Sequence, residues 1–260
     1  MITLVNTYSD FNNRKLFEME SLIVQMLLNC SPKRIEKTIL FPAGDLSQNR
    51  IISKLKEVKK CGRTYRGKIG ELKVSVVNSG IGAPFAATIL EALIRADVQR
   101  IIRLDFCGGI SEDIEIGDVV ISPSAIRGDG TTPHYLPDAK DLKIDGDIHL
   151  TNFLIEQFKK ADITVHIGPV YSHDAIFREP ESLFQKIKSL GGIAIDMETS
   201  ILFTLGFLNK ISTTSIMIVT DHPAKNQRLF EMKTLSPVIF TNLDKSIDII
   251  FNSLIKFQKL

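Results

Sequence analysis

The sequence has no strong excess of charge of either sign. Its 32 lysine and arginine residues nearly balance its 30 aspartate and glutamate residues, leaving a formal net charge of +2, and both signs are spread along the chain. A protein that binds nucleic acid or an anionic membrane without sequence preference needs a basic surface. The composition therefore argues against that class and favours a small molecule as the partner.

Cysteines and long apolar runs are also scarce. The three cysteines, Cys30, Cys61 and Cys107, show no paired metal-ligand spacing, and one disulfide would leave a cysteine over. Such usage is typical of a reducing compartment. The first residues, MITLVNTYSD, lack a basic region followed by an apolar core, and no run is long enough to span a bilayer. We therefore expect a cytoplasmic protein.

What the chain does have is a regular alternation of helix-like and strand-like patterns. With 260 residues, 44% of them hydrophobic, it is long enough to bury a full core. No linker, internal repeat or low-complexity segment divides it. The simplest interpretation is one α/β domain over residues 1–260.

The spacing of apolar residues predicts the individual elements. Helices are expected over residues 14–30, 47–58, 85–96, 151–161, 180–190, 199–210 and 235–260. Strands are expected over 38–41, 73–77, 101–102, 119–122, 164–171, 192–196 and 215–220, with a β-hairpin leading into the second of these.

Residues 101–120, IIRLDFCGGISEDIEIGDVV, carry the first candidate site. The two isoleucines predict a buried strand, which would place Arg103 at its carboxyl end and before a turn at Gly108-Gly109. Open α/β sheets bind ligands at that edge, and glycines let a ligand approach the backbone. The expected ligand is an anion. The alternative is that Arg103 pairs with a structural carboxylate, because buried arginines are commonly paired.

Two further glycine loops follow predicted strands. One contains Gly44 and precedes Ser47, a candidate N-cap, and the other, SGIGAP over 79–84, opens a helix. A strand, loop and helix in this order offer unpaired N–H groups to a phosphate, although a single such signal is weak. The second loop and Arg103 belong to one βαβ unit, so we expect a parallel pair of strands whose ends face one crevice.

Ionisable residues also stand at later strand ends and in one loop. Glu198 lies where a strand passes into a helix, where it can accept hydrogen bonds from sugar hydroxyls or only complement the helix dipole. Asp221 follows another buried strand. His134 lies in the polar segment 127–137, where it can contact a ligand or face solvent.

Three stretches taken together resemble the nucleoside phosphorylase family that contains uridine phosphorylases and hexameric purine nucleoside phosphorylases. They are SGIGAPFAATILEAL, IIRLDFCGGISEDIEIGDVVISPSAIRGDGTTPHYLP and IAIDMETSILFTLGFLNKISTTSIMIVTDH. The resemblance implies a single three-layer α/β/α domain around a mixed sheet, assembled as dimers or trimers of dimers. It also implies reversible attack of phosphate on a nucleoside, which releases a free base and ribose 1-phosphate.

The resemblance assigns roles to individual residues. Arg103 matches the family's phosphate-binding arginine, and Arg63 matches the arginine given to the phosphate site of the neighbouring subunit. Gly82 falls in the loop along the ribose and phosphate. Met197 and Glu198 match the ribose clamp, in which the glutamate accepts from the 2′ and 3′ hydroxyls. Inorganic phosphate is then a co-substrate, and neither a further cofactor nor a metal is implied.

Base specificity is implied less directly. The segment SHDAIF over 172–177 matches the family's base-binding segment, which places Ile176 and Phe177 at the base. Uridine-specific members read uracil with a glutamine and an arginine a few residues later, where this chain has Pro180 and Ser182.

The segment VTDH over 219–222 instead resembles the VSDH stretch of purine members, whose aspartate donates to N7 of the departing base. Asp221 is the matching residue, and burial would have to keep it partly protonated for that role. The resemblance therefore favours purine nucleosides, with uridine as the second possibility.

The sequence departs from the family at the phosphate site. Asp105 and Phe106 stand where the family has a glycine and a hydroxyl residue, and in a strand Asp105 points to the same face as Arg103. At a separation of about 4 Å and an effective dielectric constant near 20, such a pair interacts by roughly 4 kcal/mol before solvation costs, which competes with phosphate. Gly44 and Arg50 belong to a loop that is longer than the family's compact GDPxR pattern, so Arg50 would replace the loop arginine with altered spacing.

Three functions fit these residues. The first is phosphorolysis of nucleosides. The second is a ribosyl hydrolase in which Asp105 orients a water molecule where phosphate would otherwise bind. The third is a nucleoside-binding protein without turnover, because the phosphate site is altered.

Overall fold

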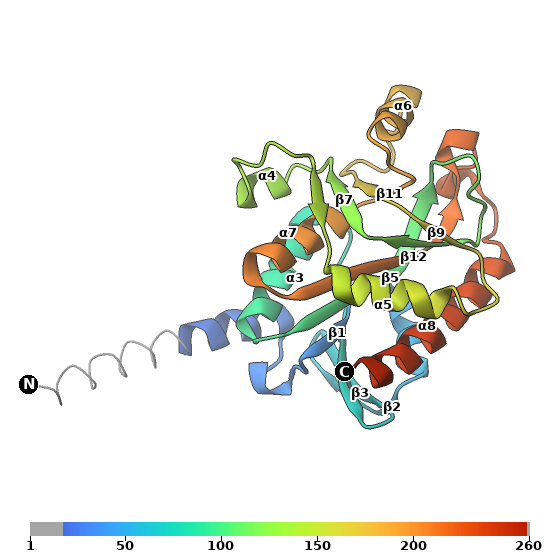
Figure 1. The fold of residues 1–260 in the computed structure, drawn as a ribbon. Coiled ribbons are helices and arrows are strands. Elements are labelled where there is room, and N and C mark those ends of the chain that lie inside the picture. The colour runs from blue at the N-terminus through green and yellow to red at the C-terminus, as the bar shows by residue number, and fades with distance from the viewer. Residues whose placement is uncertain (1–17, 259–260) are drawn as a thin grey trace, which may run out of the picture.

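The computed structural model describes residues 18–258. Its centre is one mixed sheet of twelve strands with helices on both sides (Figure 1). The strands are β1 Thr38–Leu40, β2 Lys56–Cys61, β3 Thr64–Ile69, β4 Leu72–Val77, β5 Arg100–Gly109, β6 Val119–Ser122, β7 Ser124–Arg127, β8 Lys143–Asp145, β9 Val165–Ile167, β10 Val170–Ser172, β11 Ala194–Asp196 and β12 Ser212–Asp221. The helices are α2 Asp45–Ser53, α3 Ala83–Arg95, α4 Thr132–Tyr135, α5 Ile148–Phe158, α6 Glu181–Ser189, α7 Thr199–Asn209 and α8 Pro237–Phe257, with a further helix over residues 18–28.

The long strand β5 organises the sheet. It runs parallel to β1 on one side and to β12 on the other, and its last residues pair with β11 in the antiparallel direction. The main path of the sheet is β2-β3-β4-β1-β5-β11-β10-β7-β8, while β12, β6 and β9 branch from β5. Both parallel and antiparallel pairs are present, which confirms the prediction of a mixed sheet.

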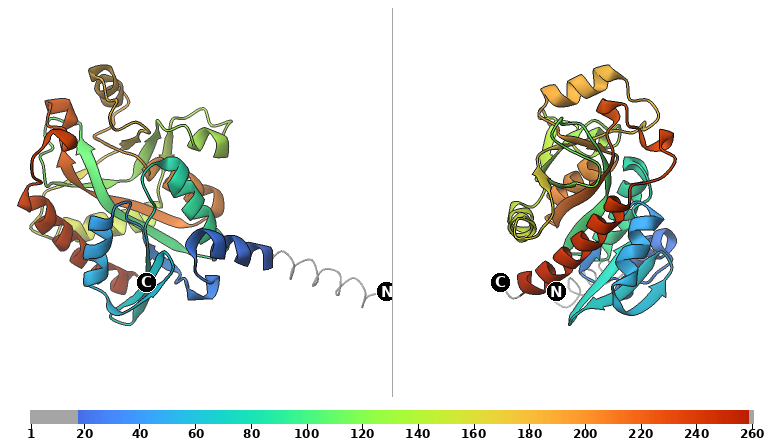
Figure 2. Two further views of the ribbon diagram at one scale, coloured as in Figure 1. Left: turned by 180° about the vertical axis from the view of Figure 1, so that it is seen from behind. Right: turned by 90° about the vertical axis from the view of Figure 1, so that its right-hand side faces the viewer.

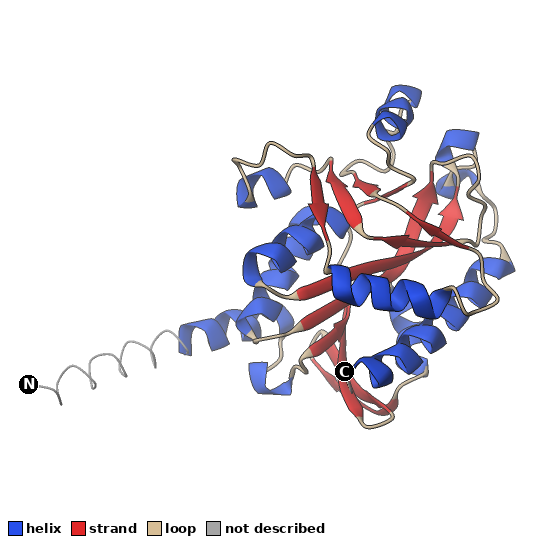
Figure 3. Cartoon of the chain, viewed as in Figure 1, coloured by secondary structure: helices blue, strands red, loops and turns tan. Residues whose placement is uncertain are grey.

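Two layers of helices cover the two faces of the sheet, as Figures 2 and 3 show from several sides. The helix over 18–28 packs with α3 and α7 on one face, and α2, α5 and α8 pack on the other. Residues of β5 alternate between the faces: Ile101 joins the first core and Ile102 the second. The three-layer α/β/α architecture is therefore confirmed.

Several element predictions were wrong at their ends. Strand β5 continues to Gly109, so Arg103 lies inside a strand and Gly108-Gly109 is not a turn. The βαβ unit does contain parallel strands, but β1 lies between β4 and β5.

Other differences arise from strand pairing. The helix predicted over 47–58 stops at Ser53, because the following residues form β2 and pair with β3. The strand predicted over 164–171 is divided into β9 and β10, and the short strands β7 and β8 and the short helix α4 were missed. Residues 14–17 and 259–260 of the predicted terminal helices lie outside the described residues.

The helix over 18–28 buries a different set of residues from the set expected. The helical spacing of the apolar residues predicts a buried face that includes Met19, Leu22 and Met26, but these three side chains are exposed, and Val24 and Leu28 are fully buried instead. Its C-terminal end is joined to β2 through a disulfide between Cys30 and Cys61, and Cys107 is free and buried. The cysteine content therefore does not indicate a reducing compartment.

Residues 18–258 contain neither a membrane-spanning helix nor a cluster of metal ligands. No described helix is both long and apolar enough to cross a membrane. Within the same residues, no group of three or more His, Cys, Asp or Glu side chains is placed to hold a metal ion. The assignment of residues 1–260 to a single domain stays a prediction.

The central strand β12 provides a test of the packing. Ile216 is fully buried, whereas Ile148 at the start of α5 is 56% exposed. We expect Ile216→Ala to lower the free energy of unfolding by about 2–5 kcal/mol, because it removes buried methyl groups and leaves a cavity. The matched change Ile148→Ala should stay within about 0.5 kcal/mol. Urea unfolding of both variants measures the difference, and equal losses would contradict this arrangement of the core.

Candidate active site

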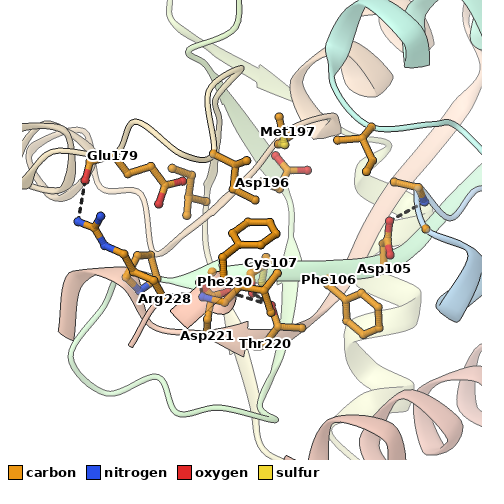
Figure 4. Close-up of a pocket in the computed structure, with 18 of the residues that line it drawn as sticks. Asp105, Phe106, Cys107, Glu179, Asp196, Met197, Thr220, Asp221, Arg228 and Phe230 are labelled. Carbon is orange, nitrogen blue, oxygen red and sulfur yellow. Dashed lines mark hydrogen bonds between the residues drawn. The ribbon is translucent and has the colours of Figure 1, made fainter. Parts of the chain in front are cut away.

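A cavity of about 490 Å³ lies against the second half of β5 and the carboxyl ends of β11 and β12 (Figure 4). β5 contributes Arg103 and residues 105–108, and the segment after β11 contributes Met197 and Glu198. Asp221 enters from the end of β12, where a register shift between Val219 and Asp221 interrupts the pairing with β5. Such an irregularity re-aims the side chains at a strand end.

Arg103 is the central cation of this cavity and is only 1% exposed. Three carboxylates contact its guanidinium. They are Asp105 at 3.3 Å from Nη1, Asp196 at 3.3 Å from Nε and Glu198 at 2.7 Å from Nη2. The Nε contact is a charge interaction without a well-aligned hydrogen bond. Both interpretations of Arg103 therefore apply, because it lines a cavity and is also paired with carboxylates.

Asp105 lies on the same face as Arg103, as strand alternation predicted. Its Oδ2 accepts a hydrogen bond from the backbone N–H of Ala43 at 2.5 Å, and its Oδ1 accepts one from the hydroxyl of Ser47 at 2.9 Å. The carboxylate is therefore bound by the loop and first turn that precede and open α2, in addition to Arg103. Figure 4 shows Asp105 at the edge of the cavity, with a dashed line for a hydrogen bond to its carboxylate.

Asp196 and Glu198 position the start of α7. Oδ2 of Asp196 accepts from the backbone N–H of Thr199 at 2.9 Å, which satisfies a free donor at the helix N-terminus. Oε1 of Glu198 accepts from the N–H of Gly82 at 2.6 Å. Gly82 has a φ of 90°, a conformation that favours glycine, so the loop before α3 can approach Glu198 closely.

The charge balance of this cluster is unusual because one cation faces three acids. Burial raises the pKa of Glu198 to about 7, although Arg103 acts in the opposite direction. Burial also raises the pKa of Asp105, against the effects of Arg103 and of the Ala43 N–H. Burial alone would lower the pKa of Arg103, but the surrounding carboxylates raise it. The guanidinium of Arg103 therefore stays charged, and its single positive charge does not balance three carboxylates.

Asp221 lies at the other end of the cavity. Burial raises its pKa, although hydrogen bonds from Thr220 and from the backbone N–H of Leu229 oppose this effect. The direction is the one that an acid needs if it is to hold a proton near neutral pH.

Aromatic and ionisable residues complete this end. Ile176 and Phe177 were predicted there from the resemblance, whereas Phe230, Arg228 and Glu179 were not. The rings of Phe177 and Phe230 lie 4.5 Å apart, both largely exposed, and Ile176 lines the cavity beside them. Arg228 donates to the backbone oxygen of Glu179, and both line the cavity. Burial, and then repulsion by Asp221, raise the pKa of Glu179 to about 7.

The sequence contained only a weak signal for the unpredicted residues Arg228, Phe230 and Glu179. The segment NQRLFE over 226–231 combines an arginine and an aromatic residue shortly after the strand that ends in Asp221. Glu179 stands next to Pro180, one of the positions compared with the uridine-reading pair. Neither this segment nor Glu179 belongs to a recognisable motif.

Two predicted phosphate ligands do not line the main cavity. Arg50 lies on α2 and pairs with Asp244 on α8 at 2.5 Å, so the prediction that it replaces the loop arginine is not supported by its position. Arg63 lines a second cavity of about 640 Å³, with its guanidinium over the ring of Phe85 at 5.5 Å. Gly44 borders both cavities.

Some of the remaining predicted residues line the main cavity and others do not. Met197 and Phe106 line the main cavity, and Gly82 lies behind Glu198 without lining it. His134 is exposed on the short helix α4 and does not line either cavity, which agrees with the interpretation that it faces solvent.

Comparisons with known proteins agree with the fold and with the resemblance. A sequence model of the phosphorylase superfamily matches residues 41–236. A purine nucleoside phosphorylase DeoD-type from Brevibacillus brevis is 31% identical over 196 residues, which cover 73% of this chain and 83% of that protein. Another from Lactococcus lactis is 32% identical over 160 residues, covering 61% of this chain and 65% of that protein.

A solved structure has the same architecture. The crystal structure of uridine phosphorylase from Vibrio fischeri superimposes with a TM-score of 0.77 and covers 87% of this chain and 95% of that chain. Its sequence identity is 21%, so this likeness concerns the fold.

The Arg103 cluster can be tested through stability. We expect Arg103→Met to lower the free energy of unfolding by about 3–5 kcal/mol, because three buried carboxylates lose their cation. Arg50→Met is the control, since Arg50 and Asp244 form a partly exposed pair whose loss should cost less than about 1 kcal/mol. Denaturant unfolding at neutral pH gives both values, and an equally small loss for the two variants would show that Arg103 does not hold this cluster together.

Proposed function

Because the chain belongs to the phosphorylase superfamily, we propose that it cleaves nucleosides by phosphorolysis and releases a free base and ribose 1-phosphate. One observation carries the proposal. A single cavity has Arg103 and the carboxylate of Glu198 at one end and the carboxyl group of Asp221 at the other. This spacing of groups suits a substrate with a sugar in the middle, an anion on one side and a base on the other.

Each group has a part in the reaction. An oxygen of inorganic phosphate forms a bond to C1′ of the ribose while the bond from C1′ to the base breaks. Arg103 binds the phosphate, a task for which a guanidinium is well suited. Glu198 accepts hydrogen bonds from the ribose hydroxyls beside Met197. The base leaves with the bonding electron pair, and Asp221 supplies a proton or hydrogen bond to it. Phosphate is the co-substrate, and no further cofactor is required.

Purine ribonucleosides are the preferred substrates in this proposal. The position and raised pKa of Asp221 suit a donor to N7 of a purine. Phe177 and Phe230 offer aromatic surfaces to the base, with Ile176 beside them. The relatives matched by sequence carry purine nucleoside phosphorylase in their names, whereas the matched structures are named uridine phosphorylase, which keeps uridine as the second substrate.

We include a homo-oligomer, a dimer or a trimer of dimers, in the proposal. Arg63 lies outside the main cavity of its own chain and borders the neighbouring one together with Lys60. From there it can serve a neighbouring subunit, as the resemblance implies. The cytoplasmic location expected from the sequence also stays a prediction.

Hydrolysis is the second candidate, and Asp105 is the observation that favours it. The donors beside Arg103 that would bind phosphate already bind this carboxylate. A water molecule is a smaller acceptor and requires no second anion in the cavity. In that case Asp105 would orient the water that attacks C1′.

The assay that tests the function measures base and ribose 1-phosphate. We expect the protein to release base from inosine or adenosine, with ribose 1-phosphate formed in the presence of phosphate, and to act more slowly on uridine. Asp221→Asn should lower kcat by about 10²-fold or more, because it removes the proton donor. Release of base without any dependence on phosphate would replace phosphorolysis by hydrolysis. If the protein cleaves none of the three nucleosides with or without phosphate, both phosphorolysis and hydrolysis are wrong.

The pKa of Glu198 predicts a pH dependence of nucleoside binding. Below a pKa of about 7 the carboxyl is protonated, so it loses charge and one acceptor for the ribose hydroxyls. We therefore expect the KM for nucleoside to rise as the pH is lowered from about 8 to about 6.

Glu179 has a pKa of about 7 in the same cavity, so the two acids must be separated. Glu198→Gln should remove the pH dependence of KM, and Glu179→Gln should retain it. Steady-state kinetics of both variants across this range decide the matter. If the pH dependence of KM disappears only in Glu179→Gln, the titrating group is Glu179, and the role given to Glu198 is wrong.

A further inference from the structure

Asp105 is a buried acid to which the proposed phosphorolysis gives no part. It is 4% exposed and belongs to a ten-residue strand in the middle of the sheet. Three donors converge on its two oxygens. They are the backbone N–H of Ala43 at 2.5 Å, the hydroxyl of Ser47 at 2.9 Å and Nη1 of Arg103 at 3.3 Å.

These donors form an anion cradle of the kind that binds a phosphate. Ala43 directly precedes Gly44, the N-cap of the nine-residue helix α2, and Ser47 lies in its first turn. A backbone N–H at a helix N-terminus, a hydroxyl and a guanidinium are the groups with which proteins bind phosphate oxygens. The same cradle borders the main cavity through Ala43, Gly44 and Arg103.

We propose that the carboxylate of Asp105 is a built-in occupant of this anion cradle, so that inorganic phosphate binds Arg103 only after displacing it. Asp105 thereby sets the affinity of the enzyme for phosphate. The inference rests on the proposed function in one respect, since it takes phosphate as the acceptor that must enter the cradle.

Two features make the carboxylate an effective competitor. Asp105 is tethered two residues from Arg103, so its local concentration at the cradle does not depend on the solution. It also accepts a hydrogen bond from each of the three donors, so an incoming anion must replace it at all three contacts.

Charge acts in the same direction. Arg103 already contacts Asp196 and Glu198 in addition to Asp105. A phosphate that entered beside all three acids would add negative charge to a buried cluster with a single cation, which is unfavourable. Removal of the Asp105 charge relieves this conflict and frees three donors at once.

Calorimetric titration with inorganic phosphate tests the proposal on the full-length protein without turnover. We expect weak binding to the wild type and at least tenfold tighter binding to Asp105→Ala. Glu179→Gln is the matched control, because it removes another carboxyl from the far end of the same cavity, and its phosphate affinity should stay within twofold of the wild type.

Asp105→Asn keeps the volume of the side chain and removes its charge, so it decides the question if Asp105→Ala does not fold. Its phosphate affinity should also rise. Equal phosphate affinity in the wild type and in the folded Asp105 variants, or no detectable binding to any of them, would overturn the proposal. An equal gain in Glu179→Gln would assign the effect to net charge alone and would also overturn it.

The titration and the nucleoside assay fail independently. If the Asp105 variants gain phosphate affinity but no nucleoside is cleaved, the proposed function is wrong and the cradle assignment holds. If the wild type cleaves inosine with phosphate and its affinity for phosphate is unaffected by substitution at Asp105, the function holds and the cradle assignment is wrong.

Discussion

The ion cluster around Arg103 is the constraint on which the site depends. A buried guanidinium is costly unless it is paired, and here the pairing comes from β5 itself, from the end of β11 and from the residue before α7. Each partner has a second task. Asp196 satisfies a backbone donor of α7, Glu198 binds the loop before α3, and Asp105 binds the loop before α2. One side chain thus connects elements that are far apart in the sequence.

The same cluster joins stability to chemistry. Three acids hold the guanidinium in a fixed position and orientation. They also neutralise its charge, so a substrate anion must compete with these carboxylates for Arg103. At the opposite end of the cavity the conditions differ. No arginine or lysine is among the groups that shift the pKa of Asp221, and burial, the largest effect, raises that pKa. The two ends therefore suit different tasks, anion binding at Arg103 and proton donation at Asp221.

Much of this arrangement could be predicted from the sequence, because it follows from local periodicity. Strand alternation placed Arg103 and Asp105 on one face, and the strand-to-helix transition placed Glu198 in the same cavity. The predicted end of β5 was wrong, because two consecutive glycines usually indicate a turn and the strand was expected to stop before Gly108-Gly109. In the fold they allow close packing instead, since a Cβ on Gly108 would meet Ile195 at 3.0 Å and one on Gly109 would meet His222 at 2.9 Å. Arg50 and Glu179 could not be assigned from local patterns, because their neighbours, Asp244 and Asp221, lie far away in the sequence.

The most direct measurement of the central claim is a pair of crystal structures, of the wild type and of Asp105→Ala, grown from the same phosphate-containing solution. Our account predicts that in the variant a phosphate accepts from Ala43, Ser47 and Arg103. In the wild type it predicts that the Asp105 carboxylate holds those donors. A phosphate bound to Arg103 in the wild type with Asp105 still in the cradle would contradict the account, as would a variant whose cradle holds no phosphate.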